Sequence, residues 1–539
     1  MGRVNVVKDT TAPEVFVSSE DRPMTADDPD VGFEGYWKKD EAAVIRVVVD
    51  GGLPAAAMNV AGSATPTACL TPCAGNCACF AVDMAPSTLN AFRGQVVVPV
   101  SGLRDAAGNV AGPQNAVVNV TRHKWLRSQT AVDPAPMRAV AVTKTGLVLW
   151  GAERESAINY RLIATAQDGG TVWTTEGMGR MTAGPMVAST KAWFATSGML
   201  GVALQPVSLS AGTQSGGECT ASVGATEFRS DLALSALADG GEIPLAVRAG
   251  VLREAATGNC AFHTLSPTPM DTQTRSSLVV LSRDGGSTEA FVAYPSDAVL
   301  WKAELGGMSG TTWTGMGDTV LPNGTQPRGL FLDGLNFVGG GGGGVAGNGA
   351  QFAAASPGML SAGTNVNSVD AGNAGPVAVG VGYAVYGRLN GDVVKLNYNT
   401  GVLAPMAQTP GGVGVLQDTT PLIGKDGMVY FVSRTGGVTA RDATTLAEEW
   451  NFPGVGGTTV VGEPALDVYR GANGAPQCLK PLGVLYVARR TNDTATLQAI
   501  LVDSNGLDVA APWPKYQHDY GNTGNSTNST LSLRAGFCP

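Results

Sequence analysis

Residues Gly427–Tyr430 read Gly-Met-Val-Tyr, a glycine that leads a short apolar strand ending in an aromatic side chain. The same pattern occurs at three other places: Gly146–Trp150 (GLVLW), Gly382–Tyr386 (GYAVY) and Gly483–Tyr486 (GVLY). The last three copies lie 45 and 56 residues apart, which is the length of a repeated unit of about four short strands with a variable loop. The pattern therefore predicts an array of small β-sheets.

The composition favours β-structure and excludes a helical protein. Gly accounts for 73 of the 539 residues and charged residues for 15%, and each Gly costs a helix roughly 1 kcal/mol relative to Ala. With 44% hydrophobic residues the chain can bury a large core, so many short strands and turns are expected. With a net charge of −9, the chain lacks the basic surface on which nucleic-acid binding depends. No apolar run reaches the ~18 residues of a membrane-spanning helix.

A second signature follows several of these strands. Ala440–Trp450 (ARDATTLAEEW) fits the pattern A-x-D-x-x-T-G-x-x-x-W, except that Leu446 stands in place of Gly; weaker copies are Leu396–Gly401 and Ala166–Trp173. The pattern resembles the blades of the pyrroloquinoline-quinone-like β-propeller family. The resemblance implies that Trp450 docks between neighbouring blades. The repeat length predicts about eight blades, with seven as the alternative.

The N-terminal part has a different sequence pattern, and we predict a separate domain at residues 9–125. Asp9–Val15 (DTTAPEV), the β-branched run Ala43–Asp50 and the turn-rich Gly102–Asn109 resemble bacterial immunoglobulin-like domains of secreted and surface proteins. Short β-branched strands and a D-x-x-G-N turn suit such a sandwich. The expected fold class is all-β: an immunoglobulin-like β-sandwich followed by a β-propeller.

The remaining boundaries follow from these two domains. Residues 1–8 are expected to be the last strand of a preceding immunoglobulin-like domain, with further modules upstream; the alternative is that Val4–Val6 belongs to the first strand of this one. A linker is expected at 126–133, the propeller at 134–525, and a tail clasped to the last blade at 526–539.

The eight Cys residues suggest disulfide bridges and hence an oxidising, extracytoplasmic compartment. Cys219 is expected to pair with Cys260, about one blade away, and Cys478 with Cys538, which would close the tail onto the last blade. Four more cysteines crowd into one short stretch: Cys69, Cys73, Cys77 and Cys79. We expect bridges there with the pairing left open. A zinc site is the alternative, although the spacing differs from repeated C-x₂-C.

The family resemblance raises the question of a quinoprotein dehydrogenase. By that resemblance such an enzyme holds its quinone over a disulfide between adjacent cysteines, and this sequence has no Cys-Cys pair. The three histidines, His123, His263 and His518, lack the spacing of an HExxH zinc site. We therefore predict no catalytic residues, no quinone cofactor and no enzymatic activity, with the dehydrogenase as the third-ranked hypothesis.

The sequence also raises the question of a calcium site. Asp503, Asn505 and Asp508 alternate oxygen donors around Gly506, as short calcium-binding loops do. The alternative interpretation is a hairpin turn that joins two strands.

The stretch Trp513–Gly524 resembles the W-P-x-x-x-x-D-x-x-x-T-G element that accompanies such propellers. We expect structural roles for its side chains, by burial against the last or first blade or by hydrogen bonding to turns. The side chains concerned are Trp513, Tyr516, His518, Asp519 and Asn522.

These features together predict a non-catalytic binding or adhesion protein of the cell surface or extracellular space. Propellers bind through loops that a rigid scaffold holds in place, and the long insertions at 205–225, 255–275 and 338–370 are the candidate loops. The expected partner is a protein or a cell-surface glycan. The alternative function is a structural or assembly component of an extracellular or envelope apparatus.

Overall fold

The structure is a computed structural model of the whole chain, and it consists of strands and connecting segments. In the N-terminal part it describes the strands and residues 109–130. It also describes most of residues 139–305 and 374–526, with short gaps, the strands between 312 and 368, and Cys538. Within these residues no helix is long and apolar enough to cross a membrane. The chain divides into two compact units, Met1–Trp125 and Leu126–Pro539.

The first unit contains two antiparallel sheets, with strand orders β1-β2-β5-β4 and β3-β6-β7. Their strands are β1 (Glu14–Val17), β2 (Ala43–Asp50), β3 (Asn59–Val60), β4 (Ala64–Thr67), β5 (Ala78–Met84), β6 (Arg93–Ser101) and β7 (Gln114–Thr121). In β6, Val98 and Val100 are buried while Val97 is 39% exposed, which is the alternation of a sheet with one face in a core. The immunoglobulin-like assignment stays a prediction, and Cys69, Cys73 and Cys77 lie outside the described residues.

The second unit is built from small sheets of successive strands. The first two sheets are β9 (Ala141–Val142), β10 (Val148–Glu153), β11 (Asn159–Thr165), β12 (Thr171–Met178), and β13 (Arg180–Val187), β14 (Lys191–Gly198), β15 (Gly201–Ser208), β16 (Glu218–Ala221). The next two are β17 (Ala233–Ala236), β18 (Glu242–Arg248), β19 (Val251–Ala256), β20 (Asn259–Ser266) with β24 (Thr312–Thr314), and β21 (Ser277–Ser282), β22 (Thr288–Ala293), β23 (Leu300–Leu305).

Between β24 and β31 the described strands form pairs, and regular sheets then resume. The pairs are β25 (Thr325–Gln326) with β28 (Gly342–Gly343), β26 (Leu330–Asp333) with β27 (Asn336–Gly339), and β29 (Gln351–Phe352) with β30 (Asn367–Ser368). The later sheets are β31 (Ala374–Gly380), β32 (Tyr383–Arg388), β33 (Val393–Asn397), β34 (Ala404–Thr409), and β35 (Leu422–Gly424), β36 (Met428–Val432), β37 (Val438–Asp442), β38 (Glu448–Phe452). The last comprises β39 (Thr459–Val460), β40 (Ala465–Val468), β41 (Gly483–Thr491), β42 (Thr494–Val502) and β8 (His123–Thr130).

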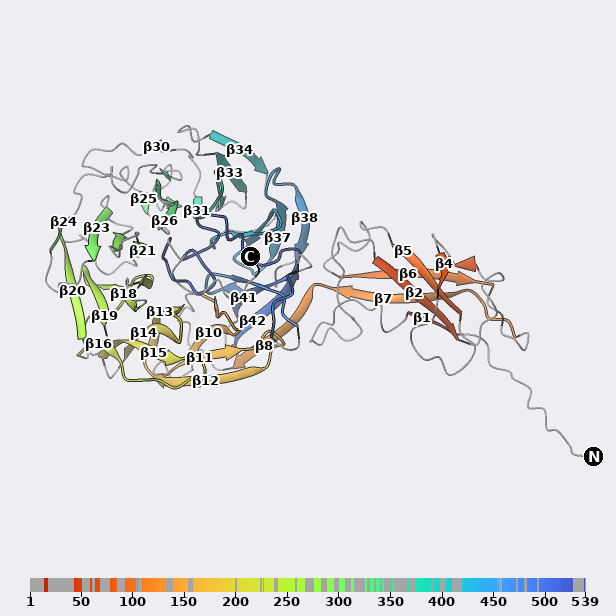
Figure 1. Cartoon of the computed structure of the whole chain (residues 1–539), viewed down its shortest axis with the longest axis horizontal. Helices are drawn as coiled ribbons and strands as arrows, with labels where there is room; N and C mark the ends of the chain where they lie inside the picture. Colours follow the sequence, from red (N-terminus) through yellow and green to blue (C-terminus); the bar gives the residue numbers. More distant parts are fainter. Residues whose placement is uncertain are drawn as a thin grey trace, which may run out of the picture. The chain divides into compact units, whose positions relative to one another are not determined.

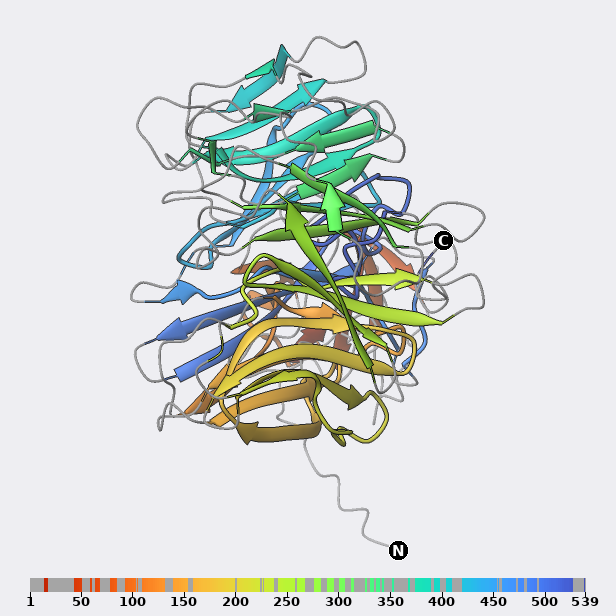
Figure 2. The same ribbon diagram turned by 90° about the vertical axis from the view of Figure 1, so that its left-hand side faces the viewer.

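These sheets stand side by side around a common centre (Figures 1 and 2). The strands that face the centre are, in order, β9, β13, β17, β21, β26, β31, β35 and β40, and β40 packs against β9. The ring is therefore closed, and the second unit is a β-propeller. The eight inner strands agree with the predicted blade number, although the blade of β26 is described only as a strand pair.

The repeat that predicted the sheets occupies one position in each blade. The four glycine-led strands are β10, β32, β36 and β41, each the second strand of its blade counted from the centre of the ring. Gly146, Gly382 and Gly427 precede these strands with positive φ angles of 83°, 81° and 74°, a conformation that favours glycine. The terminal aromatics Trp150, Tyr386, Tyr430 and Tyr486 are fully buried. Because neighbouring blades cover both faces of a sheet, these strands are continuous apolar runs.

The last blade corrects the prediction of a linker at 126–133. Residues 126–130 belong to β8, which pairs with β42 as the outer strand of this sheet. The physical reason is that β42 would otherwise present an open edge. Arg127 also donates to the carbonyl of Gly169 in the first blade at 2.6 Å, and a Cβ atom at Gly169 would clash with the Arg127 guanidinium. Residues 131–133 lie outside the described residues.

Candidate functional site

The centre of the ring is occupied by the chain's own segment Trp513–Ser526, which we call the central segment (Figure 1, dark blue). It has no regular secondary structure, yet its backbone carbonyls accept hydrogen bonds from inner strands of six blades. The donors are Val379 and Ile423 (to Trp513 and Pro514, 2.7 and 2.8 Å), and Val142, Val187, Leu234 and Val280 (to Tyr520, Gly521, Thr523 and Gly524, all 2.7 Å). An innermost strand is a sheet edge with unpaired N–H groups, and buried groups of this kind need acceptors. The central segment supplies those acceptors.

This placement corrects the expectation that Trp513 and Tyr516 lie against the last or first blade, because Trp513 pairs with Val379 and Tyr516 with Asp231. Cys538 does form the expected disulfide with Cys478, which lies between β40 and β41. Residues 527–537 lie outside the described residues, and the central segment that precedes them binds around the ring rather than to one blade. The sequence motif identified the segment. Its position at the centre of the ring depends on ring closure, so no local sequence pattern predicts that position.

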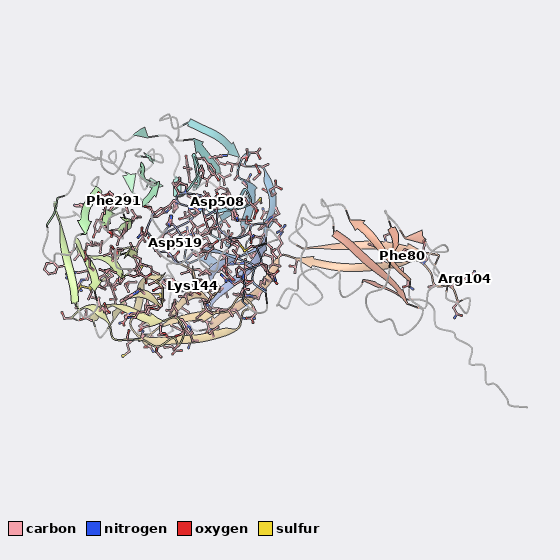
Figure 3. All side chains as sticks on the ribbon, viewed as in Figure 1. Phe80, Arg104, Lys144, Phe291, Asp508 and Asp519 are labelled. Carbon is pink, nitrogen blue, oxygen red and sulfur yellow. A yellow bond between two sulfur atoms is a disulfide. The ribbon has the colours of Figure 1, made fainter. Side chains whose placement is uncertain are left out.

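Asp519 holds the fold of the central segment, near the middle of the ring in Figure 3. Its carboxylate accepts from the backbone N–H groups of Gly521 and Thr523 at 3.0 Å each and from the Thr523 hydroxyl. Asn522 extends away from this turn and donates to the carbonyls of Val140 and Pro185 at 3.1 Å. Asp519 therefore bonds turn backbone as expected, whereas Asn522 bonds residues of the first two blades.

The aromatic residues of the segment divide between packing and hydrogen bonding. Trp513 is fully buried, and the His518 ring lies against it with a centroid distance of 5.0 Å. His518 Nδ1 lies 3.6 Å from the Asp519 carboxylate. Tyr516 is only half-buried, and its hydroxyl donates to Asp231 at 2.6 Å. The expected burial thus applies to Trp513 more than to Tyr516.

Two ionisable groups of opposite sign, Lys515 and Glu463, interact electrostatically, and burial shifts the pKa of each. Lys515 is fully buried, and its ammonium donates to the carbonyls of Tyr516 and Asp519 at 2.9 and 3.2 Å and to the Asn522 side chain. Burial lowers the pKa of Lys515 to about 8, although the Asp519 and Glu463 carboxylates oppose this shift. Burial raises the pKa of Glu463 to about 7 against a 2.8 Å hydrogen bond from the Thr420 N–H.

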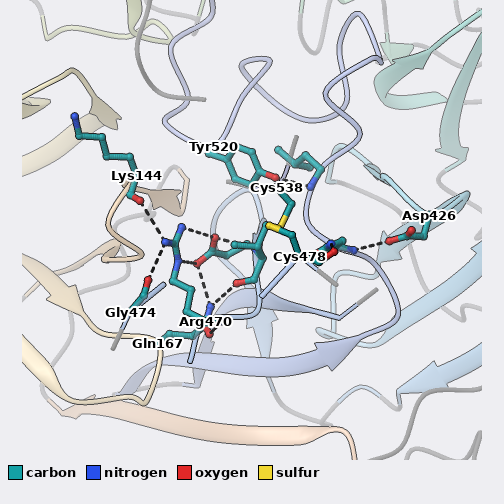
Figure 4. Close-up of a disulfide and its surroundings, with 12 residues drawn as sticks. Lys144, Gln167, Asp426, Arg470, Gly474, Cys478, Tyr520 and Cys538 are labelled. Carbon is teal, nitrogen blue, oxygen red and sulfur yellow. Dashed lines mark hydrogen bonds and ion pairs between the residues drawn. A yellow bond between two sulfur atoms is a disulfide. The ribbon is translucent and has the colours of Figure 1, made fainter. Parts of the chain in front are cut away.

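A buried polar network joins the last blade to the first (Figure 4). Arg470 donates to both Asp467 carboxylate oxygens at 3.1 and 3.2 Å and to the Lys144 carbonyl at 3.3 Å. Gln167 donates to Asp467 at 3.1 Å and accepts from the Arg470 N–H at 2.6 Å. Burial raises the pKa of Asp467 while its ion pair with Arg470 opposes that shift. This cluster, which we call the seam network, seals the ring where it closes.

The predicted calcium residues bind three different partners within the chain. Asp503 accepts from the Trp450 indole at 2.8 Å, the Asn505 amide donates to the Cys478 carbonyl at 2.8 Å, and Asp508 accepts from the Ala510 N–H at 2.9 Å. In the described part of the chain, no three His, Cys, Asp or Glu residues form a group suited to a metal ion. The alternative of a hairpin turn is wrong. After β42 the chain does not return along that strand; Leu507 pairs with Gly424 of β35, in the neighbouring blade.

Tryptophans of the outer strands dock onto neighbouring blades, as the resemblance implied. Trp450 of β38 reaches Asp503, directly after β42 of the next blade. Trp173 of β12 donates to the Leu209 carbonyl of the next blade at 2.9 Å. The expected disulfide between Cys219 and Cys260 is present and links β16 to β20, again across two neighbouring blades.

The candidate binding loops are described only in part. Of 205–225, residues 205–208 and 218–221 lie in β15 and β16, and 209–217 form the connection between these two strands. Residues 267–275, and most of 338–370, lie outside the described residues.

No protein-family model matches the sequence, and no curated protein matches it. Among solved structures, the chain is similar to the computationally designed Ika8 protein, with a TM-score of 0.45, 12% identity, and 69% of this chain and 98% of that chain covered. It is also similar to BamB from Moraxella catarrhalis, with a TM-score of 0.43, 11% identity, and 69% and 98% of the two chains covered.

Proposed function

We propose that this protein is a non-catalytic, extracytoplasmic binding protein whose propeller recognises a partner through its loops. The observation that carries the proposal is the central segment. Its carbonyls pair with inner strands of six blades, so the middle of the ring is given over to holding the fold together. The strand-connecting loops remain as the surfaces that a rigid scaffold presents to a partner.

The ionisable groups at the centre support a structural role as well. The Lys515 ammonium uses its three donors on carbonyls and an amide oxygen of the central segment itself. Tyr516 is likewise engaged by Asp231. Side chains held in this way fix the segment in place.

The two disulfides, Cys219–Cys260 and Cys478–Cys538, support an extracytoplasmic location. Structural disulfides form and persist in oxidising compartments and are rare in the cytosol.

A first experiment separates binding from quinone-dependent catalysis. We expect that the purified full chain, incubated with pyrroloquinoline quinone and Ca²⁺, keeps no quinone absorbance through gel filtration and oxidises no alcohol in a dye-linked assay. Stoichiometric retention of the quinone would overturn the proposal.

A second experiment tests binding directly. The fluorescently labelled full chain should bind saturably to intact cells of the species that encodes it, and unlabelled protein should compete. If the protein instead co-purifies from envelopes in a fixed stoichiometric complex without binding to intact cells, the structural or assembly role would replace this proposal.

A further inference from the structure

Two arginines lie on one face of the third blade, on neighbouring strands. In the antiparallel register of β18 and β19, Arg253 lies opposite Ala246 and Arg248 lies opposite Val251. Arg248 and Arg253 are therefore diagonal neighbours with side chains on the same face of the sheet. Like charges at this separation repel each other.

No acidic residue in the described part of the chain neutralises this pair. The buried Arg248 Nη1 and Arg253 Nε atoms have no hydrogen-bond partner. Burial lowers the pKa of both guanidinium groups, and Arg248 lowers that of Arg253 further. Several other arginines of this unit have carboxylate partners, for example Arg470 with Asp467 and Arg161 with Glu176, whereas Arg489 shares with this pair the lack of one among the described residues. An unpaired, partly desolvated charge is destabilising, so the pair is costly for folding alone.

Aromatic rings hold both guanidinium groups in place. Arg248 lies over Phe228 at 5.5 Å from the ring centroid, and Arg253 lies over Phe262 at 5.4 Å. Cation–π stacking of this kind orients the planar guanidinium and leaves its edges available to a planar anion. Phe228 is fully buried, whereas Phe262 is 45% exposed, so an apolar contact surface lies beside the charge.

The pair lies next to strand-connecting segments. Arg248 is the last residue of β18, and the turn Ala249–Gly250, with φ angles of 52° and 71°, leads directly into β19. Phe228 lies in the connection from β16 to β17. Connections of this kind are where propellers contact partners.

We propose that Arg248 and Arg253 form a site that binds carboxylates of an acidic segment in a partner protein, with Phe262 contacting an apolar neighbour in that segment. This inference rests on the proposed binding function and names its ligand class. Planar guanidinium groups match carboxylates bidentately, and arginine beside an exposed aromatic ring is the composition of protein–protein hot spots. The chain as a whole has a net charge of −9, so attraction of an acidic ligand requires a local site.

The test uses a fluorescein-labelled decapeptide of glutamate and measures its anisotropy with the full-length protein at low salt. We expect saturable binding that weakens as salt is added, and no binding of a glutamine decapeptide. Arg248→Gln and Arg253→Gln should each weaken binding about tenfold or more, since a charge-assisted hydrogen bond contributes about 1.5 to 3 kcal/mol. Arg253→Lys should lie between, because it keeps the charge and loses the planar fork.

Arg104→Gln is the matched control, because it makes the same charge change on an exposed residue of the other unit. It should bind the glutamate peptide as the unchanged protein does. Neither site variant should melt below the unchanged protein, since each removes a like-charge contact; this shows that lost binding is not lost folding.

Equal peptide affinity in the unchanged protein, Arg248→Gln and Arg253→Gln would overturn the proposal. So would binding of a heparin oligosaccharide, dependent on the two arginines, without binding of the glutamate peptide, because the ligand would then be a glycan. Cell binding that persists in the double variant would reject this site and leave the proposed function standing. Peptide binding without cell binding would support the site and reject the proposed function.

Discussion

Replacing Arg470 with methionine should destabilise the propeller through the carboxylate that the substitution leaves behind. The Asp467 side chain is fully buried and Arg470 nearly so, and Arg470 is the only cation bonded to Asp467 among the described contacts. Removing one partner of a buried ion pair costs about 3 to 5 kcal/mol, because the remaining charge is uncompensated. Hydrogen bonds from Arg470 to Lys144 and Gly474 are lost as well.

The pH dependence identifies this mechanism. Without Arg470, the folded-state pKa of Asp467 should rise well above the unfolded value of about 3.9. A carboxyl group whose pKa is raised by folding stabilises the protein below its unfolded pKa and loses that contribution as pH rises. The deficit of Arg470→Met should therefore be large at pH 7 and shrink towards pH 4.

Differential scanning calorimetry of the full chain checks both parts. The transition of the second unit should fall and that of the first unit should stay. Asp467→Asn combined with Arg470→Met should recover part of the loss. The control is Glu176→Gln, which removes the ion pair between Glu176 and Arg161. Because the Glu176 side chain is 42% exposed, this loss should lower the free energy of unfolding by at most about 1 kcal/mol. A deficit that is absent at pH 7, or constant between pH 4 and pH 7, would refute the reasoning.

Three further outcomes are expected. Leu446→Gly should lower the melting temperature, because truncating the fully buried Leu446 side chain costs roughly 2 to 5 kcal/mol, more than the roughly 1 to 2 kcal/mol of left-handed strain relieved at its φ of 59°; an unchanged or higher melting temperature contradicts this. Glu463 has a folded pKa raised to about 7, so its contribution should be present below about pH 4.3 and lost as pH rises to 7, and Glu463→Gln should remove that part of the pH dependence measured by urea unfolding. Deleting residues 1–121 should leave the propeller transition in place, whereas deleting 1–130 should lower it by removing β8, and equal melting of the two shortened chains would show that β8 is dispensable.

The sequence alone was sufficient for features whose cause is local. A glycine with positive φ before an apolar strand, as at Gly427, is a local requirement, so four blades could be located from their second strands and the blade number predicted from the spacing between them. The docking of Trp450 followed from the repeat pattern, and the Cys478–Cys538 bridge from positions near the end of the ring.

Features that depend on ring closure could not be predicted in the same way. His123–Thr130 has no strong strand pattern, and its partner β42 lies at the other end of the propeller sequence. The central segment is turn-rich by itself, and only the closed ring brings six inner strands to it. Asp503 and Asp508 alternate like calcium ligands in sequence, yet the path from β42 to β35 turns them towards different partners.

The pairing of β8 with β42 has a consequence for biogenesis. The strand His123–Thr130 leaves the ribosome long before Thr494–Val502, and at 5 to 20 residues per second the interval is on the order of 20 to 70 seconds. The central segment emerges later still, so its six inner strands lack their acceptors throughout that time. The nascent propeller must therefore be kept from pairing with other chains until synthesis has passed residue 526, while the first unit has all of its own strands much earlier.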